Sequence, residues 1–161
     1  MTAAHCAPAL DRLAELGLEL PDLSAPLYAY VPTRRHGDLL FISGQISRCA
    51  DGTILAGIVG ETANLDDAVK AARVSALNLL ARVHDAVGLE NVDHIVKLNG
   101  YVASTSTFTQ QPTVIDGASQ LLVDVLGERG RHARTALAAP VLPANALVEI
   151  EVTVAVKPPA S

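Results

Sequence analysis

The stretch Gly130–Lys157, GRHARTALAAPVLPANALVEIEVTVAVK, decides the fold more than any other part of this chain. Its second half, Val148–Val156, alternates valine and isoleucine with a second set of residues that includes Glu149 and Glu151. An alternation with a period of two predicts a strand with one face against a core. Arg134 stands earlier in the stretch, before a Leu-Pro turn. The stretch therefore predicts a closing strand whose acidic face lies near an arginine.

Arg134 and Glu149 are the candidate catalytic residues. A fixed guanidinium can bind a carboxylate through two parallel hydrogen bonds. A carboxylate held nearby can transfer a proton or orient a water molecule. Glu151 points to the same face as Glu149 and is the second candidate for that role. Together these residues predict a pocket for a small anionic molecule, although Arg134 could instead pair with Glu128 or Asp124 at the surface, and Glu149 could simply face solvent.

Composition excludes several classes of function. The 161 residues are expected to form one domain, residues 1–161, around a core of Ala, Val, Leu and Ile, because 50% of residues are hydrophobic and only 3% are aromatic. The net charge is -5, whereas nucleic-acid binding needs many Lys and Arg side chains to neutralise phosphates. We therefore expect no nucleic-acid partner.

Cysteine usage and hydropathy bear on location. Cys6 and Cys49 lie far apart without a CxxC motif, which favours a reducing cytoplasm over a disulfide scaffold. We find no signal peptide and no run of about 18 apolar residues, so no membrane-spanning helix is expected. The histidines show no metal-ligand spacing with acids or cysteines, so we expect no metal site.

Two long helices are predicted. Residues 64–87 have Asn64 as a good N-cap, acidic residues in the first turn and Gly88 at the end. Residues 111–126 form the second helix, with Gly127 as the stop. Both helices repeat apolar residues at helical spacing and are therefore expected to pack one face against a core.

Residues 1–26 are expected to form an N-terminal helical extension. A short amphipathic helix over residues 8–17 ends at Gly17, which can adopt the left-handed conformation. Its three leucines are expected to lie on one face of that helix: Leu10, Leu13 and Leu16.

Strands are predicted between the helices. Leu39–Ser43 is an apolar run that Gly44 ends, and the other segments are 27–31, 53–56 and 95–103. Two long helices separated by single strands predict a mixed sheet with both helices on one face. The other face would expose an apolar patch, and self-association would cover it.

These features together resemble the RidA family, also called YjgF and, in older usage, the L-PSP endoribonuclease family. The matching segments are spread over residues 28–157. They are Tyr30, thirteen residues before a Ser-Gly-Gln, then GDLLFISGQI (Gly37–Ile46), IVKLNGYV (Ile95–Val102), HAR (His132–Arg134) and VEIEV (Val148–Val152). The resemblance implies a chorismate-mutase-like α+β fold that assembles as a homotrimer, with active-site clefts between adjacent subunits.

The best-understood members of that family are enamine/imine deaminases, which hydrolyse reactive 2-imino acids to 2-keto acids and ammonia and need no cofactor. By resemblance, Arg134 would hold the substrate carboxylate and Glu149 would activate the attacking water. The resemblance also implies four substrate-binding residues. Tyr30 and Ser43 would line the pocket, and Gly44 would allow close approach of the substrate. The backbone carbonyl of Ala136 would contact the substrate nitrogen.

The chain departs from the family pattern in its N-terminal extension, in a longer segment between Phe108 and Arg134, and at two positions of the implied pocket. Ala136 stands where many family deaminases have a cysteine, so the thiol is absent while the backbone carbonyl remains. The segment around the pocket tyrosine reads Tyr28-Ala29-Tyr30, which makes Tyr28 an alternative to Tyr30.

Other functions remain open at this point. The same cleft could bind a 2-keto acid or another small carboxylate without turnover, or carry out a different hydrolytic step on a small acid. Ribonuclease activity is disfavoured by the acidic composition, the few aromatic residues and the lack of a His/Lys catalytic pair.

Overall fold

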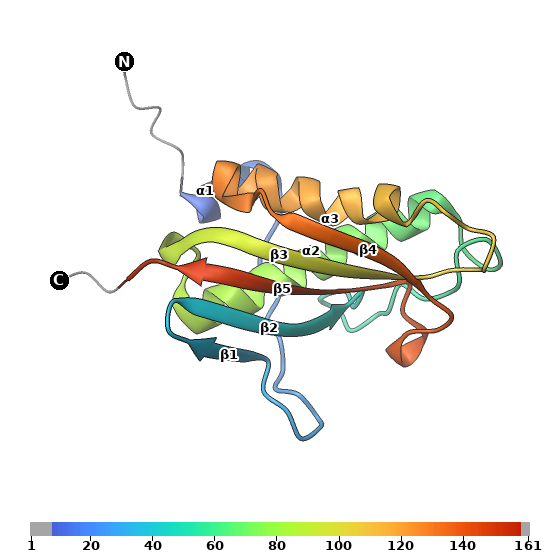
Figure 1. Cartoon of the computed structure of the whole chain (residues 1–161), viewed down its shortest axis with the longest axis horizontal. Helices are drawn as coiled ribbons and strands as arrows, with labels where there is room; N and C mark the ends of the chain where they lie inside the picture. The colour runs from blue at the N-terminus through green and yellow to red at the C-terminus, as the bar shows by residue number, and fades with distance from the viewer. Residues whose placement is uncertain (1–7, 159–161) are drawn as a thin grey trace, which may run out of the picture.

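The computed structural model describes residues 8–158, and Figure 1 shows a mixed sheet with its two long helices against one face. The five strands lie in the order β1-β2-β5-β3-β4. The fold is therefore the expected mixed α+β fold. Its helices and strands are α1 (Ala9–Glu15), β1 (Thr33–His36), β2 (Leu39–Ile46), α2 (Leu65–Val87), β3 (Val92–Ala103), α3 (Gln111–Leu126), β4 (Ala133–Ala139) and β5 (Val148–Val156), with short 3-10 turns at η1 (Leu89–Asn91), η2 (Gly127–Gly130) and η3 (Pro143–Asn145).

The closing strand β5 lies at the centre of the sheet. It pairs antiparallel with β2 on one side and with β3 on the other. β4 pairs parallel with β3, and α3 makes the crossover between them. The alternation seen in the sequence of β5 is confirmed, because every second residue from Val148 to Val156 is buried.

Both long helices begin and end where the sequence predicts. Asn64 accepts a hydrogen bond from the backbone N–H of Asp67, and the Asp67 side chain accepts one from the backbone of Asn64, which makes a capping box. α2 and α3 approach closely at Gly117, where a Cβ would lie 2.6 Å from the backbone oxygen of Val69. This close approach explains a glycine inside α3, where helix propensity alone disfavours it.

The N-terminal helix is shorter and more exposed than predicted. Leu13 is buried at 2% exposure, whereas Leu10 and Leu16 are 46% and 43% exposed, so this helix buries one of its three leucines. Gly17 does adopt the left-handed conformation, with a φ of 69°. Residues 1–7, with Cys6, and residues 159–161 of the expected domain lie outside the described part of the chain.

The predicted strand over residues 27–31 is wrong. Pro26 and Pro32 flank this segment and cannot donate to a ladder. The backbone N–H of Tyr30 instead donates to the carbonyl of Tyr28, which bends the chain. The first strand, β1, follows at Thr33–His36 and forms a hairpin with β2.

Two other strand predictions need correction. Residues 53–56 form only isolated bridges to Arg48 and Ala146, not a strand of the sheet. Gly44 does not end β2, because the strand continues to Ile46 through a register shift between Ile42 and Gln45. Such a shift is a β-bulge, which bends a strand and redirects side chains.

The sheet face opposite the helices carries apolar side chains in contact with solvent. Phe41 on β2 is 45% exposed and Leu137 on β4 is 53% exposed. In the loop before β1, Leu27 and Tyr28 are also 94% and 79% exposed. The described residues thus leave apolar surface uncovered on this face, as the sequence predicts.

Among residues 8–158, every helix is too short or too polar to cross a lipid bilayer.

Candidate active site

Glu149 lies on the sheet face that no helix covers, next to the bulge in β2. Its neighbours Val148 and Ile150 are buried on the helix side, so its side chain points to the opposite face. It contacts Gly44 so closely that a Cβ at that position would lie 2.9 Å from its Cδ and would overlap its Oε1. In the structure it is this carboxylate that lies against Gly44, and the close approach of a substrate stays a prediction.

Glu149 and Glu151 share a face but differ in their hydrogen bonds. Asn99 Nδ2 donates to Glu151 Oε1 over 3.1 Å, and the Tyr101 hydroxyl donates to the same oxygen over 3.2 Å. Within residues 8–158, the carboxylate of Glu149 accepts no hydrogen bond and forms no ion pair. Glu149 is therefore free to hold a water molecule, whereas Glu151 is fixed by its neighbours, and this difference favours Glu149 over Glu151.

Burial and like charge both act on this acidic face. Burial raises the pKa of Glu149 above its usual value, and the charge of Glu151 adds to the effect. The pKa of Tyr101 is also raised, first by burial and then by the charge and hydrogen bond of Glu151. A half-buried carboxylate with a raised pKa accepts a proton more readily than a solvated one, as a general base must.

Ser43 connects the acidic face to the tyrosine loop. Its Oγ donates to the Val31 carbonyl over 2.8 Å, and its backbone N–H donates to the Pro32 carbonyl over 2.9 Å. These bonds hold the loop with Tyr28 and Tyr30 beside the strand that carries Gly44. Both tyrosines are exposed. Within residues 8–158 their only hydrogen bond to a predicted site residue is the backbone bond between the two, so the choice between them stays a prediction.

Arg134 lies on the other side of the sheet. It pairs in register with Leu98, which is fully buried on the helix side. Its Nη1 donates to Asp116 Oδ1 over 2.6 Å and to Ser119 Oγ over 3.2 Å, and both partners lie on α3. The sequence suggested Glu128 or Asp124 as ion-pair partners, but the partner is Asp116.

One chain does not bring Arg134 and Glu149 to the same ligand. Arg134 is level with Leu98 of β3, and Glu149 is level with Tyr101, on strands that flank β3 on opposite sides. At ~3.3 Å per residue and ~4.8 Å between strands, their Cα atoms are about 14 Å apart. Their side chains also point to opposite faces, so a single pocket needs a second contributor.

Ala136 lies two residues beyond Arg134 on the same strand. It pairs with Gly100 and packs half-buried against the core, on the helix side. No thiol is present here to react or to coordinate, so any role of this position rests on its backbone.

Sequence reasoning missed several residues of this region. β4 was not predicted, and Arg134 was placed before a turn rather than on a strand. Tyr101 and Asn99 share the face of Glu149, and the alternation in IVKLNGYVA could have identified them. Asp116 and Ser119 lie on α3, far from Arg134 in sequence, and only the helix packing brings them to it.

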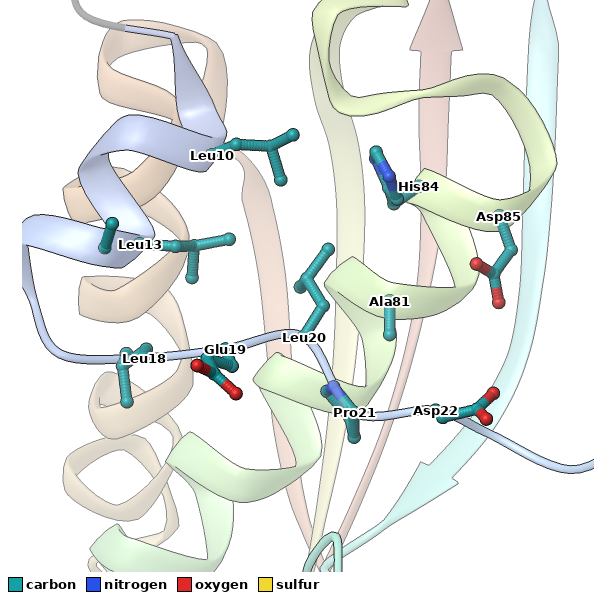
Figure 2. A pocket seen from close by; sticks show the side chains of 11 residues that line it. Leu10, Leu13, Leu18, Glu19, Leu20, Pro21, Asp22, Ala81, His84 and Asp85 are labelled. Atoms are coloured by element: carbon teal, nitrogen blue, oxygen red, sulfur yellow. The ribbon is translucent and has the colours of Figure 1, made fainter.

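A hollow in the described part of the chain lies away from these residues. It measures ≈ 510 Å³ and opens between the N-terminal segment and the end of α2. Figure 2 shows Leu10, Leu13 and Leu20 on one side and Ala81, His84 and Asp85 on the other. None of the predicted site residues lines it, so its size does not make it the candidate site. Residues 8–158 also contain no group of three or more His, Cys, Asp or Glu side chains placed to hold a metal ion.

Comparisons with known proteins bear on the family and the fold. Residues 10–155 match the family described as "YjgF/chorismate_mutase-like, putative endoribonuclease". Protein TCP17 of Trypanosoma cruzi is 38% identical over 144 residues, which cover 88% of this chain and 90% of that protein.

Two solved structures share both sequence and fold. Protein Atu1372 of Agrobacterium tumefaciens, of unknown function, is 42% identical with a TM-score of 0.85, over 93% of this chain and 92% of its own. A Shewanella oneidensis MR-1 protein with the same endoribonuclease description is 32% identical with a TM-score of 0.88, over 92% of this chain and 99% of its own. Each alignment leaves fewer residues of this chain uncovered than the 26 residues of the N-terminal segment contain. Both relatives therefore align with part of residues 1–26.

Proposed function

Because the chain belongs to the YjgF/chorismate-mutase-like family, we propose that it hydrolyses reactive 2-imino acids to 2-keto acids and ammonia, without a cofactor. The observation that carries this proposal is the carboxylate of Glu149. It is half-buried, has a raised pKa, lies against Gly44 and accepts no hydrogen bond from residues 8–158. Such a group can hold and deprotonate a water molecule.

The proposed reaction needs little beyond positioning. Water attacks the electrophilic iminium carbon while Glu149 accepts a proton from it. Glu149 returns that proton to the nitrogen of the carbinolamine. As ammonia leaves, Glu149 accepts the proton of the hydroxyl group, the carbonyl of the 2-keto acid forms, and the carboxyl then loses its proton to water. Arg134 would bind the substrate carboxylate, and its Nε and Nη2 are not used by the bonds to Asp116 and Ser119. Holding both reactants in place contributes much of the rate in such a step.

We further propose that Arg134 of one subunit and Glu149 of another complete each site in a homotrimer. Two observations support it: the two residues lie on opposite faces of one sheet, and the open face exposes apolar side chains such as Phe41 and Leu137. An apolar face of this kind is covered in closed symmetric oligomers. As a location, we propose the cytoplasm, where the free thiol of Cys49 would stay reduced.

The first test is a trapping assay. An amino-acid oxidase generates 2-imino acids in the presence of semicarbazide, and the protein competes with the trap. We expect wild type to compete, and Arg134→Ala and Glu149→Gln not to. Glu61→Gln, a change at an exposed loop residue, serves as the matched control. Uncatalysed loss of the imino acid with pure wild type would contradict the proposal.

A mixing experiment tests the two-chain site. Arg134→Ala and Glu149→Gln are unfolded together, refolded as mixed oligomers and assayed. If the site is shared, mixed oligomers contain interfaces with both residues intact, and part of the activity returns. Activity that stays absent in verified mixed oligomers would place both residues of a working site in the same chain.

A second candidate function is binding of a 2-keto acid without turnover, favoured by alanine at position 136 in place of a thiol. Saturable thermal stabilisation by keto acids, with no loss of imino acids, would support it. The endoribonuclease description of the relatives adds a third assay, RNA cleavage. The net charge of -5 disfavours that activity.

A further inference from the structure

Arg134 lies at the end of a chain of hydrogen bonds that connects β4 with α3 and η2. The ring of His132 bonds through Nδ1 to the Gly130 carbonyl over 2.6 Å and through Nε2 to Ser119 Oγ over 2.9 Å. Ser119 Oγ in turn accepts from Arg134 Nη1 over 3.2 Å. Three contacts thus link, in series, the Gly130 carbonyl, the His132 ring, the Ser119 hydroxyl and the Arg134 guanidinium.

The chemistry of these groups permits one direction only. A carbonyl can only accept, so Nδ1 of His132 must donate to Gly130. In a neutral ring Nε2 is then an acceptor, and the hydroxyl of Ser119 donates to it. The oxygen of Ser119 keeps its lone pairs for the Arg134 N–H, so every contact is satisfied when His132 is the neutral Nδ1–H tautomer.

The surroundings of His132 favour this neutral form. Burial is the largest effect and lowers its pKa, the positive charge of Arg134 lowers it further, and the Gly130 carbonyl acts in the opposite direction. Asp116 pairs with Arg134 and partly balances the charge of the guanidinium. At neutral pH the ring is therefore uncharged and its Nε2 can accept.

Asp116 alone would not hold the arginine in place. Its side chain is 69% exposed, whereas that of Arg134 is 24% exposed. Exposed ion pairs contribute little to a fixed geometry. Ser119 and His132 are half-buried and anchored to the backbone of η2, so they are better placed to fix the rotamer of Arg134.

We propose that Ser119 and His132 are positioning residues, which orient the guanidinium of Arg134 so that its Nε and Nη2 face a ligand carboxylate. This inference rests on the carboxylate-binding role of Arg134 in the proposed function. It adds that the neutral Nδ1–H tautomer of His132 is part of the anion site, although the ring never touches the ligand.

The test combines NMR with binding of 2-oxobutyrate measured by calorimetry. Nitrogen-15 spectra of the wild-type oligomer should show His132 as the Nδ1–H tautomer. Ser119→Ala and His132→Gln should weaken 2-oxobutyrate binding by about fivefold, the value of one net hydrogen bond. Ser119→Thr keeps the hydroxyl and should bind nearly as wild type, and His36→Gln, on the exposed strand β1, is the control for the histidine change.

His132 also reports on occupation of Arg134. A bound carboxylate offsets the charge of the guanidinium, so the pKa of His132 should rise when 2-oxobutyrate is added. In Arg134→Gln the pKa should be raised already and should not respond to the ligand. A purely structural role of His132 would not produce this response.

The outcomes separate this inference from the proposed function. An Nε2–H tautomer, or Ser119→Ala binding 2-oxobutyrate as wild type does, overturns the positioning role even if deamination is observed. Weaker binding by both variants, in a protein that binds 2-oxobutyrate but hydrolyses no imino acid, supports the positioning role and overturns the deaminase. A wild-type protein that binds no carboxylate overturns both.

Discussion

Replacing Gly44 with alanine tests the candidate site most directly, because the structure separates its effect on Glu149 from its effect on folding. Gly44 does not have a positive φ, so alanine fits its backbone. The new Cβ would lie 2.9 Å from Cδ and 3.2 Å from Cγ of Glu149 and would overlap Oε1. The neighbour that must move is the end of a flexible side chain, and the fold is expected to survive.

The magnitudes differ strongly between stability and activity. A glycine-to-alanine change in a compatible conformation stabilises by about 0.4–1 kcal/mol through the unfolded state, and displacement of Glu149 offsets part of this. We therefore expect a melting temperature within about 4 °C of wild type. The carboxylate must shift by roughly 1 Å, and a misplacement of that size can cost about 100-fold in rate.

Gly100→Ala is the contrasting variant. Its Cβ would lie 2.6 Å from Cδ1 of Ile115, a fully buried residue of α3. Overpacking of this kind costs about 1–3 kcal/mol, so this variant should melt several degrees lower. Calorimetric melting and the trapping assay are measured on both. Full deaminase activity in Gly44→Ala, or a loss of stability as large as in Gly100→Ala, would refute the reasoning.

Four further predictions follow from single contacts. The pKa of Glu149 is raised above 4.5, so this group stabilises the fold below that pH, and its contribution is lost as pH rises through the raised pKa. In Glu149→Gln the denaturation midpoint should therefore depend less on pH between 4.5 and the raised pKa. The same change should cost about 100-fold or more in activity. Asn78 donates to the Ile46 and Arg48 carbonyls over 3.1 and 2.8 Å, and Asn78→Ala should cost about 2 kcal/mol in urea unfolding; an unchanged midpoint would show that water replaces the amide. Loss of the Asn64 capping box in Asn64→Ala should cost about 1 kcal/mol, with Asn64→Ser restoring most of it. Phe41→Glu should shift sedimentation from trimer toward monomer if the open face is the interface, and a trimer that persists would place the interface elsewhere.

Local patterns predicted the elements that local physics controls. α2 and α3 were predicted to within a residue because Asn64, Gly88 and Gly127 mark their ends and their apolar residues repeat at helical spacing. β5 was predicted because one of its faces is buried and the other is not. In each of these cases the signal lies within the segment itself.

Elements that depend on distant partners were predicted poorly. β4 reads ARTALAA, which is alanine-rich and lacks alternation, so only pairing with β3 and cover from α3 make it a strand. Residues 27–31 carry two tyrosines, a leucine and a valine and look like a strand, but prolines on both sides and the Ser43 contacts hold them as a loop.

The sequence by itself determined the fold class, the family and the identities of Arg134, Glu149, Ser43 and Gly44 as candidates, because motifs and periodicity are properties of residue order. Only the tertiary structure decided where those residues lie. It placed Gly44 against Glu149, bound Glu151 to Asn99 and Tyr101, and set Arg134 on the opposite side of the sheet. The reason is that strand register, and not position along the chain, determines which face a side chain occupies and which neighbours it meets.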